Sequence, residues 1–144
     1  MTVVAPIELV KAFVLSRASI ADCVGDRVWL NMEEPPKGWT PECGDGLIIM
    51  TRGGQAHNYI DKLATESYYF RCYPGAKTPV AAERLCTLIG DAIHNCANLP
   101  VEIDGKPVAW LVLCQRSGVI GVDFTKNKQW PYFVAAFDFT ISRE

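Results

Sequence analysis

The stretch that decides the fold is ESYYFRCYPGAKTPVAAERLCTLIGDAIHNC, residues 66–96. Its first eight residues alternate, so that Tyr68, Phe70 and Cys72 share one face, and this period of two predicts a β-strand over residues 66–73. A proline–glycine pair follows and turns the chain. The stretch therefore opens with a strand that has one apolar face, as a strand lying on a protein core requires.

The rest of the stretch carries the pattern of a helix. Thr78 provides a hydroxyl N-cap, and Pro79 suits the first helical position because no N–H group is needed there. One apolar stripe then repeats at helical spacing: Ala81, Leu85, Leu88, Ile89, Ala92 and Cys96, with Ile93 beside it. We therefore expect a helix over residues 79–96. It should pack on one face of the sheet through four of these side chains: Leu85, Leu88, Ile89 and Ala92.

Outward from this stretch, the same periodicities predict five further elements. They are a helix over about 6–20 and strands over 27–32, 47–52, 107–114 and 132–141. The order is then α-β-β-β-α-β-β, and runs of strands with few helices are typical of α+β proteins. We expect a mainly antiparallel sheet of about five strands with two helices packed on it. A chain of 144 residues also has the length of one ordinary domain, so residues 1–144 should form a single domain.

Three long connections are predicted, over residues 33–45, 54–65 and 115–131. The first holds three prolines, two glycines and four acidic residues against one lysine. Loops of this length without structure of their own are usually functional. These connections are therefore the first place to look for contacts with a partner.

Composition and charge argue against several classes of protein. Hydrophobic residues make up 49% of the chain and charged residues 21%, which is typical of a globular protein. The net charge is −2, with 7 basic and 9 acidic residues in 1–72 and 7 of each in 73–144. Such a balance argues against binding nucleic acid through its phosphates. No apolar run approaches 18 residues and no signal peptide is recognised, so we expect no contact with a membrane.

The six cysteines do not form a recognisable metal or disulfide pattern. Their spacings of 20, 29, 14, 10 and 18 residues include no closely spaced pair, which zinc ribbons and knuckles need. Disulfide frameworks of this size belong to shorter, secreted chains. We expect free thiols, used as small core hydrophobes in a protein that folds in a reducing cytoplasm.

No catalytic arrangement is recognised. His57 is interpreted as a solvated loop residue and His94 as a residue that suits the end of a helix. Gly53 and Gly54 follow a strand, but no lysine of a phosphate-binding loop comes after them. Cys23 is a conceivable nucleophile, yet the sequence supplies no base to activate it. We predict no catalytic residue, no cofactor and no metal site.

Aromatic and basic residues in the loops are better candidates, as points of contact with a partner. A tryptophan in a polar loop either folds back to pin the loop or faces a partner, and tryptophan and arginine are enriched among interface hot spots. Two lysines beside one aromatic ring are too few for a nucleic-acid site. The candidate interface residues are Trp39, Arg52, Arg116, Lys126, Lys128 and Trp130.

Taken in order, several segments resemble one known family. The segments are Cys23-Val-Gly-Asp-Arg-Val28, Leu47-Ile-Ile-Met50, Tyr68-Tyr-Phe-Arg-Cys-Tyr73, Thr78-Pro-Val-Ala-Ala-Glu-Arg-Leu85 and Phe133-Val-Ala-Ala-Phe-Asp-Phe-Thr-Ile141. With the helix and loops around them, they resemble the tail terminator (tail-completion) proteins of long-tailed bacteriophages over roughly residues 6–142. The cysteines and the proline-dense loop 33–45 depart from the family's pattern.

The resemblance implies a structural role. Such a subunit has an α+β fold, assembles as a hexameric ring, caps the finished tail tube, and offers a docking surface for the head connector or stopper protein. It has no enzymatic activity and no cofactor. It is found in the virion, at the head–tail junction, after assembly in the host cytoplasm. DNA passes through the ring without specific binding, and a slightly negative net charge suits that passage.

A ring also makes a demand on the subunit surface. Head-to-tail contacts need two different complementary patches on each copy. The sequence offers two candidates, the acidic loop 33–45 with Trp39, and the set Arg52, Lys126, Lys128 and Trp130.

Two other functions remain open. One is another neck component of the phage, such as a head-closure protein. The other is a small α+β enzyme or ligand-binding domain that uses Cys23 or the pair Asp26 and Arg27.

Overall fold

The fold was obtained as a computed structural model, which describes residues 4–52 and 63–143. Within these residues there are three α-helices and one 3-10 turn: α1 (Pro6–Leu15), α2 (Ala18–Val24), α3 (Pro79–Ile93) and η1 (Pro41–Cys43). There are six strands: β1 (Val28–Leu30), β2 (Gly46–Thr51), β3 (Leu63–Tyr73), β4 (Ala97–Ile103), β5 (Lys106–Phe124) and β6 (Pro131–Ser142). The α+β class is as predicted, with one helix and one strand more than expected.

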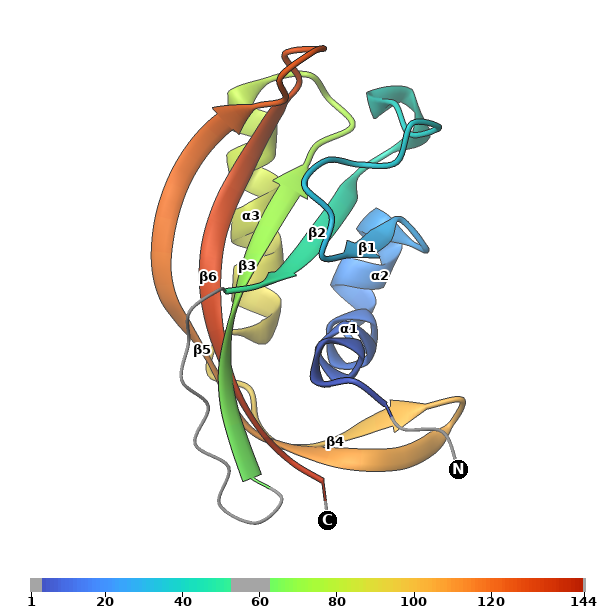
Figure 1. The fold of residues 1–144 in the computed structure, drawn as a ribbon, viewed down its shortest axis with the longest axis vertical. Coiled ribbons are helices and arrows are strands. Elements are labelled where there is room, and N and C mark those ends of the chain that lie inside the picture. Colours follow the sequence, from blue (N-terminus) through green and yellow to red (C-terminus); the bar gives the residue numbers. More distant parts are fainter. Residues whose placement is uncertain (1–3, 53–62, 144) are drawn as a thin grey trace.

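All six strands form one sheet in the order β1-β2-β3-β6-β5-β4. Every neighbouring pair is antiparallel except β1 and β2, which run parallel. Figure 1 shows that the sheet curls around the helices, so that the β4–β5 hairpin passes beneath α1. The helices therefore share the hollow face of the sheet, and the other face carries none of the described helices.

The core lies between this hollow face and the helices. The strands contribute the side chains that the predicted alternation places on one face. Among them, Tyr68, Phe70 and Phe137 are all at most 1% exposed. The Phe70 ring lies 4.8 Å from that of Phe137, and Phe13 of α1 packs edge-on against Phe139 of β6. Aromatic rings thus join the first helix to the two central strands.

Helix α3 packs on the sheet by a face slightly different from the predicted one. The buried apolar residues are Ala82, Leu85, Cys86, Ile89 and Ile93. Leu88 and Ala92, which were expected at the sheet, are only half-buried. The reason is that α3 has two neighbours, the sheet on one side and α2 on the other. The helix also ends at Ile93 rather than at residue 96.

The predicted first helix over 6–20 is in fact two helices. The backbone of Arg17 is extended, with φ −85° and ψ 115°, and the Ser16 hydroxyl donates a hydrogen bond to the carbonyl of Phe13. A serine side chain that bonds to the backbone in this way competes with the helical hydrogen bonds. The turn lets both helices reach the core, through Phe13 of α1 and through Ile20 and Val24 of α2.

The largest difference from the sequence prediction concerns β4 and β5. Strand β4 was not predicted, and the expected connection over 115–131 is mostly strand, because β5 runs without a break from Lys106 to Phe124. Asp104 and Gly105 join the two strands with φ values of 53° and 77°, the left-handed pair of a tight hairpin turn. Most of the expected loop 54–65 lies outside the described residues.

Candidate assembly surfaces

The loop after β1 is anchored by Trp39, which is only 5% exposed. Its ring makes edge-on contacts with three others, those of Trp29, Tyr73 and Trp130, at centroid distances of 6.1, 5.9 and 5.4 Å. Its indole N–H donates a hydrogen bond to the carbonyl of Gly44 at 3.1 Å. Of the two roles considered for this tryptophan, the structure therefore supports pinning its own loop.

Trp130 and the two candidate lysines lie in the turn between β5 and β6. The turn is closed by Thr125, whose N–H donates to the Trp130 carbonyl at 2.9 Å and whose hydroxyl accepts from the Trp130 N–H at 3.0 Å. The Lys126 N–H donates to the carboxylate of Glu34 at 3.1 Å, which ties this turn to the loop after β1. The side chains of Lys126 and Lys128 are exposed.

A cleft of about 580 Å³ opens between these two loops, with acidic and basic side chains in its lining. Arg71 crosses it, donating to the Glu33 carbonyl while its guanidinium lies 5.4 Å over the Tyr132 ring. The acidic loop and the basic–aromatic turn are therefore packed together within one subunit. Within one subunit, these two segments therefore form one adjoining surface, while Arg52 of the second candidate set lies elsewhere.

Arg52 and Arg116 lie away from this cluster. Arg52 is placed over the ring of Tyr69, 5.4 Å from its centroid. The Arg116 guanidinium lies between α3 and the sheet, 5.9 Å from the Phe137 ring centroid and 3.8 Å from the carboxylate of Asp91. A Cβ atom on Gly90 would meet it at 2.0 Å. Arg116 thus joins the helix to the sheet inside the subunit.

The residues considered for chemistry have structural partners. Arg27 donates from Nε to the Asp45 carbonyl at 2.8 Å and from its terminal nitrogen to the Cys23 carbonyl at 3.0 Å. Burial, followed by the nearby Asp45 charge, raises the pKa of the Cys23 thiol. A raised pKa leaves less of the thiolate, which is the reactive form. His57 lies outside the described residues.

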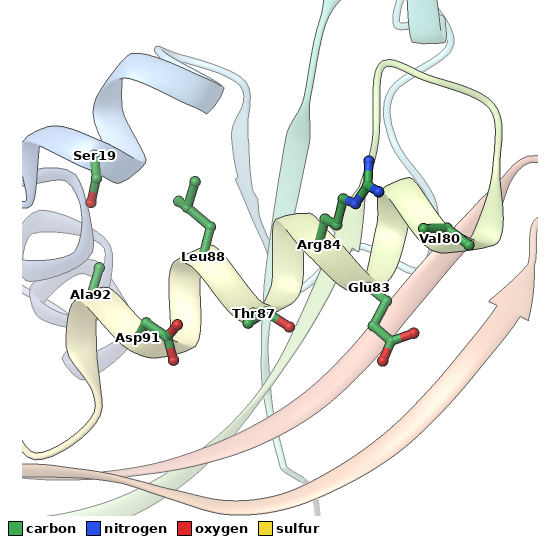
Figure 2. A pocket seen from close by; sticks show the side chains of 8 residues that line it. All are labelled: Ser19, Val80, Glu83, Arg84, Thr87, Leu88, Asp91 and Ala92. Carbon is green, nitrogen blue, oxygen red and sulfur yellow. The ribbon is translucent and has the colours of Figure 1, made fainter.

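A groove runs along the outer side of α3, beside α2. Its volume is about 680 Å³. Figure 2 shows Leu88 and Ala92 pointing toward the side where Ser19 of α2 lies, while Glu83 and Asp91 point away. The lining includes neither histidine nor cysteine. The groove offers an apolar floor with charged edges, and no nucleophile–base pair.

The half of β5 that lies toward its C-terminal end carries a group of exposed apolar side chains. Four large side chains between residues 119 and 124 are well exposed: Val119 at 59%, Ile120 at 63%, Val122 at 41% and Phe124 at 44%. Between Arg116 and Asp123 the sequence carries no charge. Exposed apolar residues scattered singly are normal, whereas a group of this kind is a candidate contact surface.

This half of β5 also lacks a strand on one side. Pairing with β4 ends at Leu113, and two further backbone hydrogen bonds join Cys114 to Asn95 and Cys96. The Arg116 N–H then donates to Nδ1 of His94 at 3.0 Å. Beyond this point, none of the described strands pairs with that side of β5. We call residues 117–124 the free edge.

The sequence analysis did not predict a strand at the free edge, and its two glycines explain why. Gly118 and Gly121 read as loop residues, whereas each follows an irregularity in the pairing with β6, between Arg116 and Gly118 and between Val119 and Gly121. Bulges of this kind bend a strand and tolerate glycine. The signal that could have revealed the strand is the β-branched Val119, Ile120 and Val122 close together.

The comparisons with known proteins do not assign this chain to a family. Neither the models of known protein families nor the curated proteins include a match to this chain. Among the residues that the structure describes, no group of three or more potential ligands could hold a metal ion, and none of the helices is long and apolar enough to cross a membrane.

Proposed function

We propose that this protein is a structural subunit of the tail of a long-tailed bacteriophage. It caps the tail tube as a ring of identical subunits, six in number, and provides the docking surface for the head connector or stopper protein. The sequence resemblance described above suggests this role. The observation that carries it is the free edge, a long apolar strand side that is open to another chain. Natural proteins normally protect such an edge by charge, by cover or by pairing.

The other surfaces of the described residues agree with a role in assembly. The groove beside α3 has no reactive pair in its lining, and the cleft between the two loops has its arginine bonded to backbone and stacked on a tyrosine. The pKa of the Cys23 thiol is raised, and the Arg27 guanidinium is hydrogen-bonded to two backbone carbonyl groups. Both observations disfavour the alternative of a small enzyme that uses these residues.

In the ring, the free edge of one subunit and a different surface of its neighbour would form the repeated contact. A head-to-tail contact that closes by rotation gives a ring whose two faces differ. That difference is what a cap needs, because one face meets the tube and the other meets the connector. A net charge of −2 gives DNA no cationic surface overall to hold it in the opening.

The test is deletion of this protein from the phage that encodes it. We expect filled heads and tails that fail to join, with tails of irregular length because the tube has lost its cap. Complementation by the intact chain should restore joined particles, whereas a variant with Ile120→Lys on the free edge should not. Normal joined particles from the deletion would contradict the proposal. Tails of normal length with heads that lose their DNA would favour the head-closure alternative.

A further inference from the structure

Two cysteines of the core meet where α3 packs on the sheet. Cys72 lies on the hollow face of β3 and Cys86 on the buried face of α3, and both belong to the same hydrophobic core. Both are free thiols. The Cys72 thiol donates a hydrogen bond to the Cys86 sulfur. The two sulfur atoms are therefore already in contact, although one comes from a strand and the other from a helix.

The two thiols differ in their surroundings. Cys72 is 0% exposed, and its hydrogen bond to Cys86 together with burial raises the pKa of its thiol. The same hydrogen bond, aided by the charge of Arg116, lowers the pKa of Cys86, which is 6% exposed. Arg116 is held close because its guanidinium packs against Gly90, one turn further along α3. A thiol stabilised as the thiolate is the nucleophile of such a pair, and its protonated neighbour can resolve the oxidised product.

We propose that Cys72 and Cys86 form a redox site, at which hydrogen peroxide converts the two thiols into a disulfide that joins β3 to α3. The Cys86 thiolate attacks one peroxide oxygen and the O–O bond breaks. The leaving hydroxide takes up the proton that Cys86 released and becomes water, and Cys86 becomes a sulfenic acid. The Cys72 sulfur then attacks the Cys86 sulfur, the S–O bond breaks, and the hydroxyl group leaves with the Cys72 proton as a second water. The peroxide gains the two electrons that the thiols lose.

A second pair of cysteines provides a comparison within the same core. A backbone hydrogen bond of 2.8 Å joins the Cys114 N–H to the Cys96 carbonyl. The Cys96 thiol, however, donates to the carbonyl of Ala92 at 3.4 Å, and burial raises the pKa of Cys114. The Cys96 sulfur is thus engaged elsewhere and Cys114 is kept protonated, so this pair should oxidise later than Cys72 and Cys86.

The bond would close a short loop that contains the turn after β3 and the first turns of α3. Such a link restricts the unfolded chain and so stabilises the folded one. In the proposed function, on which only this consequence rests, the pair would be thiols during assembly in the reducing cytoplasm and a disulfide in particles outside the cell. Formation of the bond does not depend on that function. A phage deletion without effect would therefore remove the proposed function and leave the redox site in place.

The test treats the full, reduced chain with hydrogen peroxide, blocks the remaining thiols in denaturant, and maps disulfides by mass spectrometry. Cleavage after Arg and Lys and before Asp places Cys72 in the peptide 72–77 and Cys86 in the peptide 85–90, apart from the other four cysteines. We expect these two peptides to be joined, and to separate when dithiothreitol is added. The linked protein should melt about 5–10 °C higher than the reduced protein.

Single variants test the role of each thiol. Cys86→Ala should leave Cys72 without a disulfide, whereas Cys72→Ala should stop at the sulfenic acid of Cys86, which dimedone traps. Cys96→Ala is the matched control and should still form the link. Absence of the link at a peroxide concentration that fully oxidises exposed Cys43, or earlier formation of a bond between Cys96 and Cys114, would overturn the proposal. A link that leaves the melting temperature equal or lower would overturn the stabilising role of the bond.

Discussion

At the scale of single residues, Trp39 shows how a loop that is rich in proline can be rigid. Its side chain contacts three aromatic rings and donates a hydrogen bond to one backbone carbonyl, and these contacts fix the position of the loop. We expect Trp39→Ala to lower the free energy of unfolding by about 3–5 kcal/mol, as for other buried large-to-small changes. Urea unfolding followed by circular dichroism measures this. Trp110→Ala is the control, since Trp110 is 43% exposed and should cost far less; equal losses would show that Trp39 does not anchor the loop.

The cysteines differ in their surroundings, and one of them should react first. All six are free thiols. Hydrogen bonds from the backbone and the hydroxyl of Thr40, aided by the Arg27 charge, lower the pKa of Cys43, which is exposed. Burial raises the pKa of Cys114.

Because a thiol reacts as the thiolate, a lowered pKa moves the rise in reactivity to lower pH. We expect alkylation of Cys43 to reach half its maximal rate at a lower pH than alkylation of free cysteine. Mass spectrometry after limited labelling measures the rate, and Thr40→Val should move the midpoint upward. A midpoint at or above that of free cysteine would contradict the arrangement around Thr40. With denaturant and no reductant, six thiols should be counted.

At the scale of elements, the packing of α3 gives two adjacent side chains, Ile89 and Leu88, different degrees of burial. Ile89 is wholly buried against the sheet, whereas Leu88 is half-buried beside the groove. Ile89→Ala should cost about 2–5 kcal/mol, and Leu88→Ala clearly less, because less surface leaves the core and the groove can relax. Paired urea unfolding curves test this. A loss for Leu88→Ala as large as that for Ile89→Ala would contradict this packing and place both side chains at the sheet, as the sequence pattern predicts.

The bulges of β5 give a second comparison within one element. Gly121 has a φ of 118°, which a side chain rarely tolerates, whereas Gly118 has no positive φ; both have open space around them. Gly121→Ala should therefore cost on the order of 1–3 kcal/mol through backbone strain, and Gly118→Ala should be close to neutral. Similar effects of the two changes on the melting temperature would show that the second bulge imposes no strain.

The elements that the sequence predicts best are those in which a single hydrophobic period runs through the whole element. The central strands β3 and β6 and the helix α3 have uninterrupted alternation or helical spacing, and all three are found close to the predicted bounds. Strand β4 was missed although Asp104 and Gly105 are a typical hairpin pair, because Pro100 disfavours an interior strand. At the edge of a sheet, where β4 lies, that proline is tolerated.

The candidate surfaces were harder to predict than the fold. The sequence places tryptophans and lysines in loops, but it does not show that two loops pack on each other, as they do through Trp39 and Trp130. Nor does it show where β4 stops pairing, and this is what leaves residues 117–124 open. The packing of the loops and the end of the β4–β5 pairing both depend on contacts between distant segments. The local periodicity of the sequence carries no information about such contacts.

At the scale of the whole molecule, the proposed function requires a subunit that can contact other chains. A curled sheet holds the helices on its hollow face, and one end of the sheet leaves an apolar strand side open (Figure 1). A standard stable contact buries about 1,600 Å² in total, so a contact between subunits of the proposed ring would have to extend beyond the free edge to neighbouring surfaces. The groove beside α3 is a candidate for that extension.

The most direct measurement is to add the purified protein to uncapped tail tubes of its phage and to image the tubes by electron microscopy. The proposed function predicts a ring of six copies at one end of each tube, and the loss of that ring with Ile120→Lys. Protein that remains off the tube ends, or that binds there as a single copy, would contradict it.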